Sequence, residues 1–425
     1  MNPFHLIFFN LCLLLAACVW DRTNESLDSL PLDDSEYPYA GLPRLVIETE
    51  NFTQVRDKET KIPAQMQIWG EKEPESEVIE LTVKGRGNSS FEMSKYSIKL
   101  ELTNKREMLG MPADKDWALI SNHADKTLMR NYIAFKLSAK IGSYYAPRCE
   151  FVELYLNRKY QGVYLLTETI KIGDNRINIP KNRDSYLVEF DARSKKNDQT
   201  IYSDVFSAKG SKKIFTIHEP KNALPEELNI IQNHICEFEE FLKSVDANKD
   251  NKLEKWIDLE ESIKHYWIQE FARNPDSKFF SSVYFTWTSA GKIRMGPVWD
   301  FDLAFGNHYY EGYNSSVGWE IRNYWNTFLF KDSLYRTETE SLWVSYRKFF
   351  ESSIFCIDTL YYKLKKAADN NFKRWPILPE NSGYWLHSSY SSYEQPVDDL
   401  KVWIRKRFNW IDAQILIPSP TQPAS

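Results

Sequence analysis

The sequence predicts an α+β protein with two lobes, in which a β-rich first part precedes a mainly helical second part. Apolar and polar residues alternate with period two in much of the first half, which indicates half-buried strands. Beyond residue 225, apolar residues recur mainly at helical spacing. A chain of 425 residues is also too long for one small core and suits two lobes.

The first lobe is expected over residues 43–220 and contains most of the predicted strands. Val, Ile and aromatic residues at alternating positions mark these strands. They lie at residues 45–49, 64–69, 78–83, 96–102, 151–156, 160–167 and 186–191. One helix is predicted at residues 125–140, where Leu128, Ile133 and Leu137 share a face and Asp125 can cap the start.

The second lobe is expected over residues 221–416 and is mainly helical. A strand pair at residues 283–287 and 292–295 interrupts the helical pattern. The last helix is predicted at residues 396–416, with Leu400, Ile404 and Phe408 on one stripe. Residues 417–425 are expected to be a disordered tail on the basis of their composition.

The amino-terminal residues predict a processed and lipidated protein. Residues 6–17 are apolar, but this run is too short for a spanning helix, which needs about 20 residues. It ends in Leu15, Ala16, Ala17 and Cys18, which resembles a bacterial lipobox. We therefore expect a signal peptide at residues 1–17, a lipid on Cys18 and a flexible tether over residues 18–42. This arrangement predicts anchoring to the membrane of a bacterial cell envelope rather than a soluble secreted form.

Overall composition limits the possible partners and metals. A net charge of -5 gives no electrostatic case for nucleic acid, which requires clustered basic residues. Aromatic residues make up 15% of the chain, which suits an aromatic-rich core better than a sugar- or peptide-binding groove. If Cys18 is lipidated, the three thiols of Cys149, Cys236 and Cys356 remain, and their odd number argues against a disulfide framework. Zinc-type Cys or His spacing is absent from the sequence.

Two acidic sites bracket the predicted strand pair of the second lobe. Asp276 precedes it, and Asp300 and Asp302 follow it in the segment Trp-Asp-Phe-Asp. Phosphoryl-transfer enzymes place a carboxylate that orients a hydroxyl beside a carboxylate that holds a metal. Alternatively, the acidic segment opens a helix, with its acids near the positive end of the helix dipole. The segment alone does not decide between these interpretations.

A glycine segment lies between two predicted strands of the first lobe. It reads Gly-Arg-Gly-Asn-Ser-Ser from residue 85 to residue 90, and the next strand carries Lys95 and Lys99 on one face. Small residues allow backbone N–H groups to approach phosphates, and a lysine supplies a cation. The alternative is a tight hairpin followed by exposed strand lysines.

Six segments together resemble the spore-coat protein H (CotH) kinase family. They occur at residues 85–90, 95–100, 109–117, 125–131, 162–168 and 296–307, and the similarity covers residues 43–416. The resemblance implies an atypical protein kinase-like fold of two lobes that binds ATP with Mg²⁺ or Mn²⁺ between them. It also implies phosphorylation of Ser and Thr hydroxyls on cell-envelope or secreted proteins.

The resemblance assigns roles to residues of both lobes. Asp276 would orient the acceptor hydroxyl, Asp300 would hold the metal, and Asp302 is a possible extra ligand. The nucleotide would be contacted by the glycine segment, by one or both lysines and by an acid that positions the lysine or the metal. These cofactor-binding residues are Gly85, Arg86, Gly87, Asn88, Ser89, Lys95, Lys99 and Glu168.

Besides the possible extra ligand Asp302, the chain departs from ordinary protein kinases in two respects. Ser281 occupies the position where a conventional kinase has an Asn metal ligand, which puts a second metal in doubt. The predicted helix at residues 125–140 has no Glu that could pair with a lysine, and Arg130 and Asn131 lie on it instead. These two residues either serve the nucleotide site or tie the helix to a neighbouring acid, and we favour the second role.

Three functions remain possible from the sequence. The first is an ATP-dependent phosphotransferase that acts on protein substrates at the cell surface. The second is a binding or assembly module without turnover, because ATP is scarce outside the cytoplasm. The third is a transferase that uses a nucleotide to move another group, such as AMP. The sequence gives no indication of the oligomeric state.

Overall fold

The computed structural model describes residues 32, 34–194, 198–206, 212–289, 291–381 and 388–416. The expected signal peptide at residues 1–17, the lipidated Cys18 and the disordered tail at residues 417–425 lie outside the described residues. The expected tether at residues 18–42 lies only partly within them.

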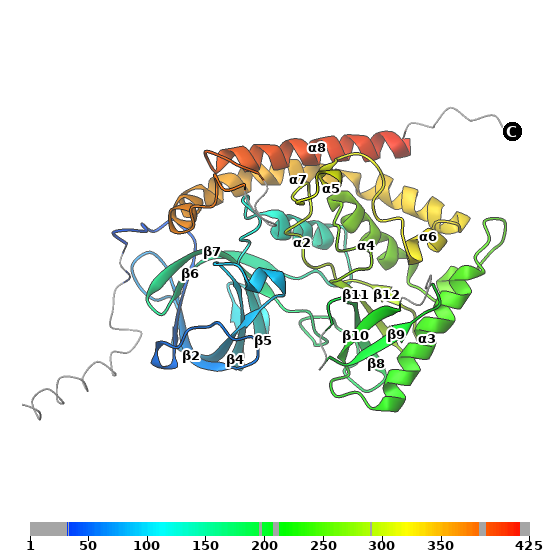
Figure 1. Ribbon diagram of the computed structural model, residues 1–425, viewed down its shortest axis with the longest axis horizontal. Helices are drawn as coiled ribbons and strands as arrows, with labels where there is room; N and C mark the ends of the chain where they lie inside the picture. The colour runs from blue at the N-terminus through cyan, green and yellow to red at the C-terminus, as the bar shows by residue number, and fades with distance from the viewer. Residues whose placement is uncertain are drawn as a thin grey trace, which may run out of the picture.

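A closed barrel of seven strands forms the N-terminal region, drawn in blue to cyan in Figure 1. Its spatial order is β1-β2-β3-β4-β5-β7-β6. The strands are β1 (Arg44–Thr49), β2 (Ile62–Trp69), β3 (Ile79–Arg86), β4 (Ser97–Met108), β5 (Met111–Ile120), β6 (Cys149–Leu156) and β7 (Lys159–Glu168). Parallel pairing of β1 with β6, with Leu45 opposite Leu154, closes the barrel, whereas the other pairs are antiparallel.

The barrel interior has its own apolar core because one face of each strand points inward. In β3, Ile79, Leu81 and Val83 are buried while Glu80 is exposed, as the alternation in the sequence predicts. The indole of Trp117 on β5 is fully buried in the same cluster. The predicted strands at residues 45–49, 64–69 and 78–83 are thereby confirmed to within a few residues.

A second sheet of five strands lies beside the barrel, drawn in green in Figure 1. Its order is β12-β11-β8-β10-β9. The strands are β8 (Ser185–Phe190), β9 (Thr200–Ser203), β10 (Lys213–Glu219), β11 (Val283–Thr288) and β12 (Arg294–Met295). The central strand β8 therefore pairs with β11, which follows it only after two long helices.

Helices cover both sheets and join them. They are α2 (Arg130–Lys140), α3 (Pro225–Lys243), α4 (Leu259–Ala272), α5 (Glu311–Asn314), α6 (Trp325–Leu329), α7 (Ser333–Arg374) and α8 (Glu394–Leu416). Helices α7 and α8 run side by side along one edge of the molecule, and α3 flanks the second sheet (Figure 1). A large apolar cluster includes residues from α2, α3, α4, α6, α7 and α8 and from the second sheet.

The expected kinase-like two-lobed fold is wrong. The N-terminal region is a closed, mixed seven-stranded barrel, and the C-terminal part is helical. Strands β8, β9 and β10, which precede residue 220, form one sheet with β11 and β12, which follow it. Alternation identifies a strand but does not identify its partner, and the closing pair of Leu45 with Leu154 leaves no local signal in the sequence.

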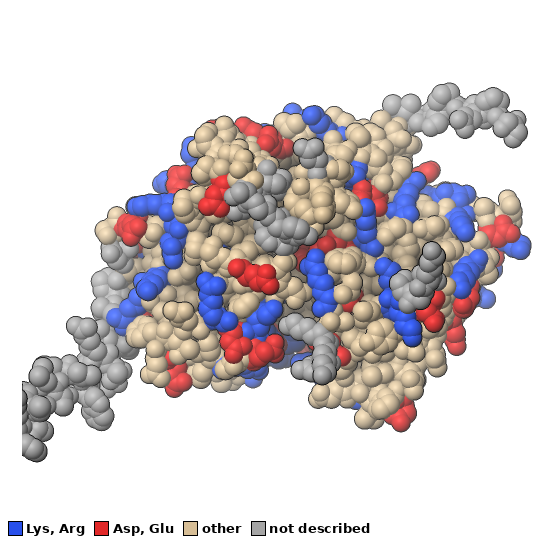
Figure 2. All heavy atoms as spheres, in the orientation of Figure 1, with Lys and Arg blue, Asp and Glu red and all other residues tan. Residues whose placement is uncertain are grey.

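Two further observations concern the helices and the molecular surface. Within the described residues, none of the helices combines the length and apolarity that crossing a membrane requires. On the face shown in Figure 2, acidic and basic side chains are interspersed over the barrel and the helical part alike.

Candidate functional site

A cleft of about 390 Å³ lies between the barrel and the second sheet. Its walls come from residues 84–90 at the end of β3, 120–124 after β5, 189–193 after β8, 276–284 and 299–303. Nine of the predicted site residues line it. They are Gly85, Arg86, Gly87, Asn88, Ser89, Lys99, Asp276, Asp300 and Asp302. The cleft therefore brings together segments that lie more than two hundred residues apart in the chain, such as those of Gly85 and Asp302.

The glycine segment forms a tight turn at one wall of the cleft. Gly87 has a φ of +98°, and a Cβ atom there would lie 2.2 Å from the hydroxyl of Ser90. A short 3-10 turn (Ser89–Phe91) follows, in which the backbone N–H of Phe91 donates to the carbonyl of Asn88 at 3.1 Å. The turn itself therefore requires glycine at position 87, whatever the cleft binds.

Asp300 is held in a left-handed backbone conformation with a φ of 65°. Such a conformation is uncommon for residues other than glycine and often occurs at functional sites. The Asn274 side-chain amide donates to the Asp300 carbonyl at 3.0 Å, and the next backbone N–H, that of Phe301, donates to Asn131 Oδ1 at 2.9 Å. Among the described residues that follow Asp302, the first helix is α5, which begins at Glu311, so the acidic segment does not open a helix directly.

Asp276 also lines the cleft, on the loop that follows α4. Its backbone N–H donates to Asn274 Oδ1 at 3.3 Å, so the same Asn274 side chain positions both acidic segments. The Asp276 side chain is 16% exposed, and an Arg193 guanidinium nitrogen lies 4.0 Å from its carboxylate. Burial, and then the charge of Asp300, raises the pKa of Asp276 to about 6, although Arg193 opposes the shift.

Asp302 lies beside Asp300 and shares its electrostatic environment. Burial raises the pKa of Asp302 well above its ordinary value, and the charges of Asp300 and Asp276 act in the same direction. A hydrogen bond between the carboxyl groups of Asp302 and Asp300 accompanies this shift. The hydroxyl of Ser282 donates to Asp300 Oδ2 at 3.3 Å. A bound cation would oppose the rise in the pKa of Asp302, because it favours ionised carboxylates.

The donor set of the cleft fits a magnesium ion but not a metal held by protein alone. In the part of the chain that the structure describes, no group of three or more His, Cys, Asp and Glu side chains is placed to bind a metal. Magnesium is usually bound by one or two carboxylates, with phosphates and waters as its remaining ligands. Asp300 and Asp302 supply two such carboxylates on one turn.

Lys99 is one of two predicted lysines, and it lines the cleft. Its ammonium lies 3.1 Å from Asp116 on the neighbouring strand, and its side chain is 34% exposed. Asp116 also pairs with Lys171 at 2.5 Å. Lys99 is therefore already paired with a carboxylate, which it shares with Lys171.

Lys95 lies outside the cleft, in the packing between the barrel and α7. Its ammonium donates to the Ser121 carbonyl at 2.7 Å, to the Val163 carbonyl at 2.5 Å and to Asn371 Oδ1 at 2.9 Å. The residue is 1% exposed, and burial lowers its pKa well below the ordinary value. These contacts assign Lys95 a structural role at the barrel–helix junction.

We expect Lys95→Met to destabilise the protein without changing its affinity for a nucleotide. The change leaves the carbonyls of Ser121 and Val163 buried without a donor, which costs about 3 kcal/mol. Urea unfolding measures the loss of stability, with Lys99→Met as the control that leaves the junction intact. A Lys95→Met protein of unchanged stability that no longer binds nucleotide would contradict this assignment.

Glu168, at the end of β7, also lies outside the cleft. Its carboxylate is fully buried and pairs with Arg148 at 2.8 Å and with Arg176 at 2.7 Å. It also accepts a hydrogen bond from the Tyr145 hydroxyl at 3.0 Å. This network fixes the chain that leaves the barrel. Among the described residues, Glu168 contacts neither a lysine nor the acids of the cleft.

Several cleft residues were not predicted as site residues, among them Glu189, Asp191 and Arg193, which follow one another at alternate positions from the end of β8. Asn131, for which the sequence left a role at the nucleotide site open, lines the cleft from α2. Glu189 accepts the backbone N–H of Ser282 at 3.0 Å and therefore positions the loop that contacts Asp300. The sequence does carry a signal for Glu189, Asp191 and Arg193, because they are charged residues at alternate positions at the end of a buried strand.

Comparison with known families identifies the chain. The family model described as CotH kinase protein matches residues 83–411, from the third barrel strand to the last helix. The chain belongs to the CotH kinase family. The match confirms the resemblance that the six sequence segments indicated, and it includes all the predicted site residues that line the cleft. None of the curated proteins matches the chain.

Proposed function

We propose that this CotH family protein is an ATP- and divalent-metal-dependent phosphotransferase that phosphorylates Ser and Thr hydroxyls of cell-envelope or secreted proteins. The observation that carries the proposal is the placement of Asp276 and Asp300 in one cleft, both positioned by Asn274. Protein kinases use such a pair of carboxylates in phosphoryl transfer, one for the acceptor and one for the metal. Family membership supports the same chemistry.

In the proposed reaction, Asp276 accepts a hydrogen bond from the acceptor hydroxyl and directs its oxygen toward the γ-phosphorus. A bond forms between this oxygen and phosphorus, and the bond from phosphorus to the oxygen bridging the β- and γ-phosphates breaks. ADP leaves, and the hydroxyl proton passes to the Asp276 carboxylate. The pKa of about 6 allows Asp276 to be ionised before the step and still accept a proton.

Asp300 and Asp302 are the residues that would hold magnesium or manganese. Such an ion neutralises the charge of the phosphate oxygens when it is bound. Asn274 and Asn131 fix the backbone around Asp300 by hydrogen bonds of 3.0 and 2.9 Å, so the carboxylate is preorganised. The backbone of the glycine segment, which also lines the cleft, can approach phosphates closely.

The test is incubation of the purified mature protein with ATP, magnesium and a library of Ser- and Thr-containing peptides. We expect ADP release and peptides that gain one phosphate by mass spectrometry. Peptides that gain AMP instead would support the alternative transferase. Absence of any transfer together with absence of a metal-dependent thermal shift with ATP would favour the binding module.

We expect the transfer rate to rise with pH as Asp276 loses its proton, with a midpoint near the pKa of about 6 in kcat/KM. Arg193 lowers this pKa, so Arg193→Gln should move the midpoint to higher pH. The control is Arg183→Gln, whose guanidinium pairs with Glu227 on α3 instead. An unchanged midpoint in Arg193→Gln would show that another group controls the profile.

We also propose that the protein acts at the bacterial cell envelope through a lipid on Cys18. The Leu-Ala-Ala-Cys segment at residues 15–18 supports this proposal. Intact-mass measurement of the protein from membranes should show cleavage before Cys18 and an added lipid. Cys18→Ala should release the protein from the membrane fraction, because it removes the residue that would carry the acyl chains. Stable anchoring needs two or more such chains.

A further inference from the structure

Arg86 is the last residue of β3, and its guanidinium lies in the wall of the cleft. Its Nη1 is inaccessible to solvent and has no hydrogen-bond partner among the described residues. Burial lowers the pKa of Arg86, while the charges of Tyr284 and Asp300 oppose that shift. An arginine remains protonated in proteins, so this nitrogen is a cationic donor without an acceptor.

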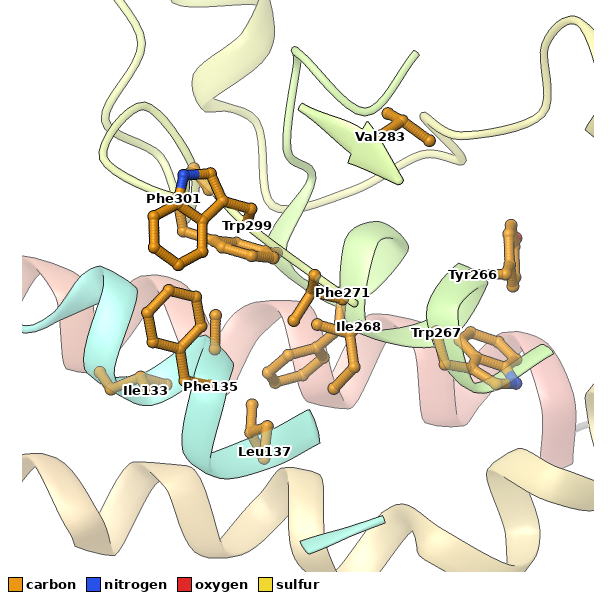
Figure 3. Packing of buried hydrophobic residues seen from close by; sticks show 14 of the residues in the cluster. Ile133, Phe135, Leu137, Tyr266, Trp267, Ile268, Phe271, Val283, Trp299 and Phe301 are labelled. Atoms are coloured by element: carbon orange, nitrogen blue, oxygen red, sulfur yellow. The ribbon is translucent and has the colours of Figure 1, made fainter. Parts of the chain in front are cut away.

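An aromatic stack holds the Arg86 guanidinium. It lies 5.1 Å from the centroid of the Trp299 ring, within the range of a cation–π contact. Trp299 in turn stacks on Phe135 of α2, with ring centroids 5.4 Å apart and an interplanar angle of 24°. Figure 3 shows Phe135 of α2 next to Trp299 and Phe301. Because Trp299 directly precedes Asp300, the same turn places the cation and the proposed metal-holding carboxylate.

The two predicted lysines do not offer a comparable donor. Lys95 uses its ammonium for three acceptors outside the cleft, and Lys99 is paired with Asp116. Protein kinases place their phosphate-binding lysine by an ion pair with a helical Glu. Helix α2 contains no Glu or Asp, so such an ion pair cannot form here.

We propose that Arg86 is the polyphosphate-binding cation of this cleft, and that the stack of Phe135 and Trp299 positions it in place of an ion pair. The ligand class is a chain of two or three phosphates, to which the planar guanidinium presents paired donors. The inference rests on the proposed function only in taking ATP as the natural source of these phosphates.

Inorganic tripolyphosphate is the probe, and calorimetry on the folded mature protein is the measurement. We expect Arg86→Gln to weaken tripolyphosphate binding by about tenfold to a hundredfold, because charge-assisted hydrogen bonds are lost. Lys99→Gln should weaken it by less than about threefold, because Lys99 is partly exposed and already paired. Adenosine binding should be unchanged in Arg86→Gln, which a general loss of structure would not allow.

The stack is tested with a second set of variants. Trp299→Leu should weaken tripolyphosphate binding severalfold, and Trp299→Phe, which keeps a ring, should restore most of it. Arg56→Gln is the matched control, because Arg56 lies 4.7 Å over the Tyr96 ring but does not line the cleft. Circular dichroism and thermal melts establish that each variant is folded.

Several results would overturn the inference: no tripolyphosphate binding by the wild type, an Arg86→Gln protein of unchanged affinity, or an equal loss in Lys99→Gln. The proposed function fails separately. If tripolyphosphate binds through Arg86 but no phosphate is transferred from ATP, the inference stands without the activity. If transfer occurs and Arg86→Gln binds normally, the activity stands without the inference.

Discussion

Asp276→Asn and Asp300→Asn should each abolish phosphate transfer while leaving the protein folded. Asn cannot accept the acceptor proton at position 276, so we expect a loss of about 10²–10⁴-fold there. At position 300, the amide removes one of the two carboxylates available for the cation, and the metal-dependent thermal shift with ATP should disappear. Transfer is measured by ADP release and by the phosphate gained by the peptide.

Stability distinguishes a reactive carboxylate from a structural one. Folding raises the pKa of Asp276 from 3.8 to about 6, so its ionised form is disfavoured in the folded state. The contribution of Asp276 to the free energy of unfolding is therefore greatest below pH 3.8. It falls as pH rises from 3.8 to about 6 and is smallest above pH 6. Asp276→Asn should therefore raise the free energy of unfolding at pH 7.5, by up to roughly 3 kcal/mol, and have little effect at pH 3.5.

The control for both changes is Asp250→Asn, an exposed loop acid remote from the cleft. It should change neither transfer nor stability by a measurable amount. Transfer by Asp276→Asn and Asp300→Asn at the wild-type rate would refute the assigned roles. A large loss of stability in Asp276→Asn would instead indicate that this carboxylate supports the fold.

Arg407→Met should destabilise the protein by about 3–5 kcal/mol, because it leaves a buried carboxylate without its cation. Arg407 on α8 and Glu270 on α4 are both fully buried and lie 2.5 Å apart. The same guanidinium donates to the Glu270 carbonyl at 2.8 Å and to the Gly318 carbonyl at 2.8 Å. These bonds fasten the end of α4, directly before the loop of Asp276, to the last helix.

The comparison for this change is Arg347→Met, which breaks the ion pair of Arg347 on α7 with Asp412 on α8. Arg347 is 33% exposed, and exposed pairs contribute less than about 1 kcal/mol. Urea unfolding gives both values. Equal losses of unfolding free energy in the two variants would show that burial does not make the Arg407–Glu270 pair more important for stability.

Local features of the cleft could be predicted from the sequence because each has a chemical signature. The glycine turn, the acid after the proline of the Asn274 segment and the acids after Trp299 all line the cleft, as their motifs suggested. The roles of these residues remain predictions. Glu189 and Asp191 were missed, although the strand that carries them was predicted, because a charged strand end also suits an ordinary solvated loop.

Tertiary features could not be predicted in this way. Lys95 and Lys99 were expected on one face of one strand, but Lys95 precedes β4, and its hydrogen bond to Asn371 shows that it faces α7 rather than the cleft. Glu168 ends its hairpin as predicted, yet its partners Arg148 and Arg176 come from segments without a pattern. Barrel closure could not be predicted for the same reason, since it depends on contacts between residues far apart in the chain.

Helix α7 has a mechanical consequence for the cleft. Its 42 residues form a continuous rod of about 63 Å. One end is bonded to the barrel through Asn371, Arg374 and Trp375, and the rest packs on α2, α4 and α8. Helix α7 therefore links the barrel to α4, which directly precedes the loop of Asp276, and a continuous helix in this position opposes hinge motion between the barrel and α4.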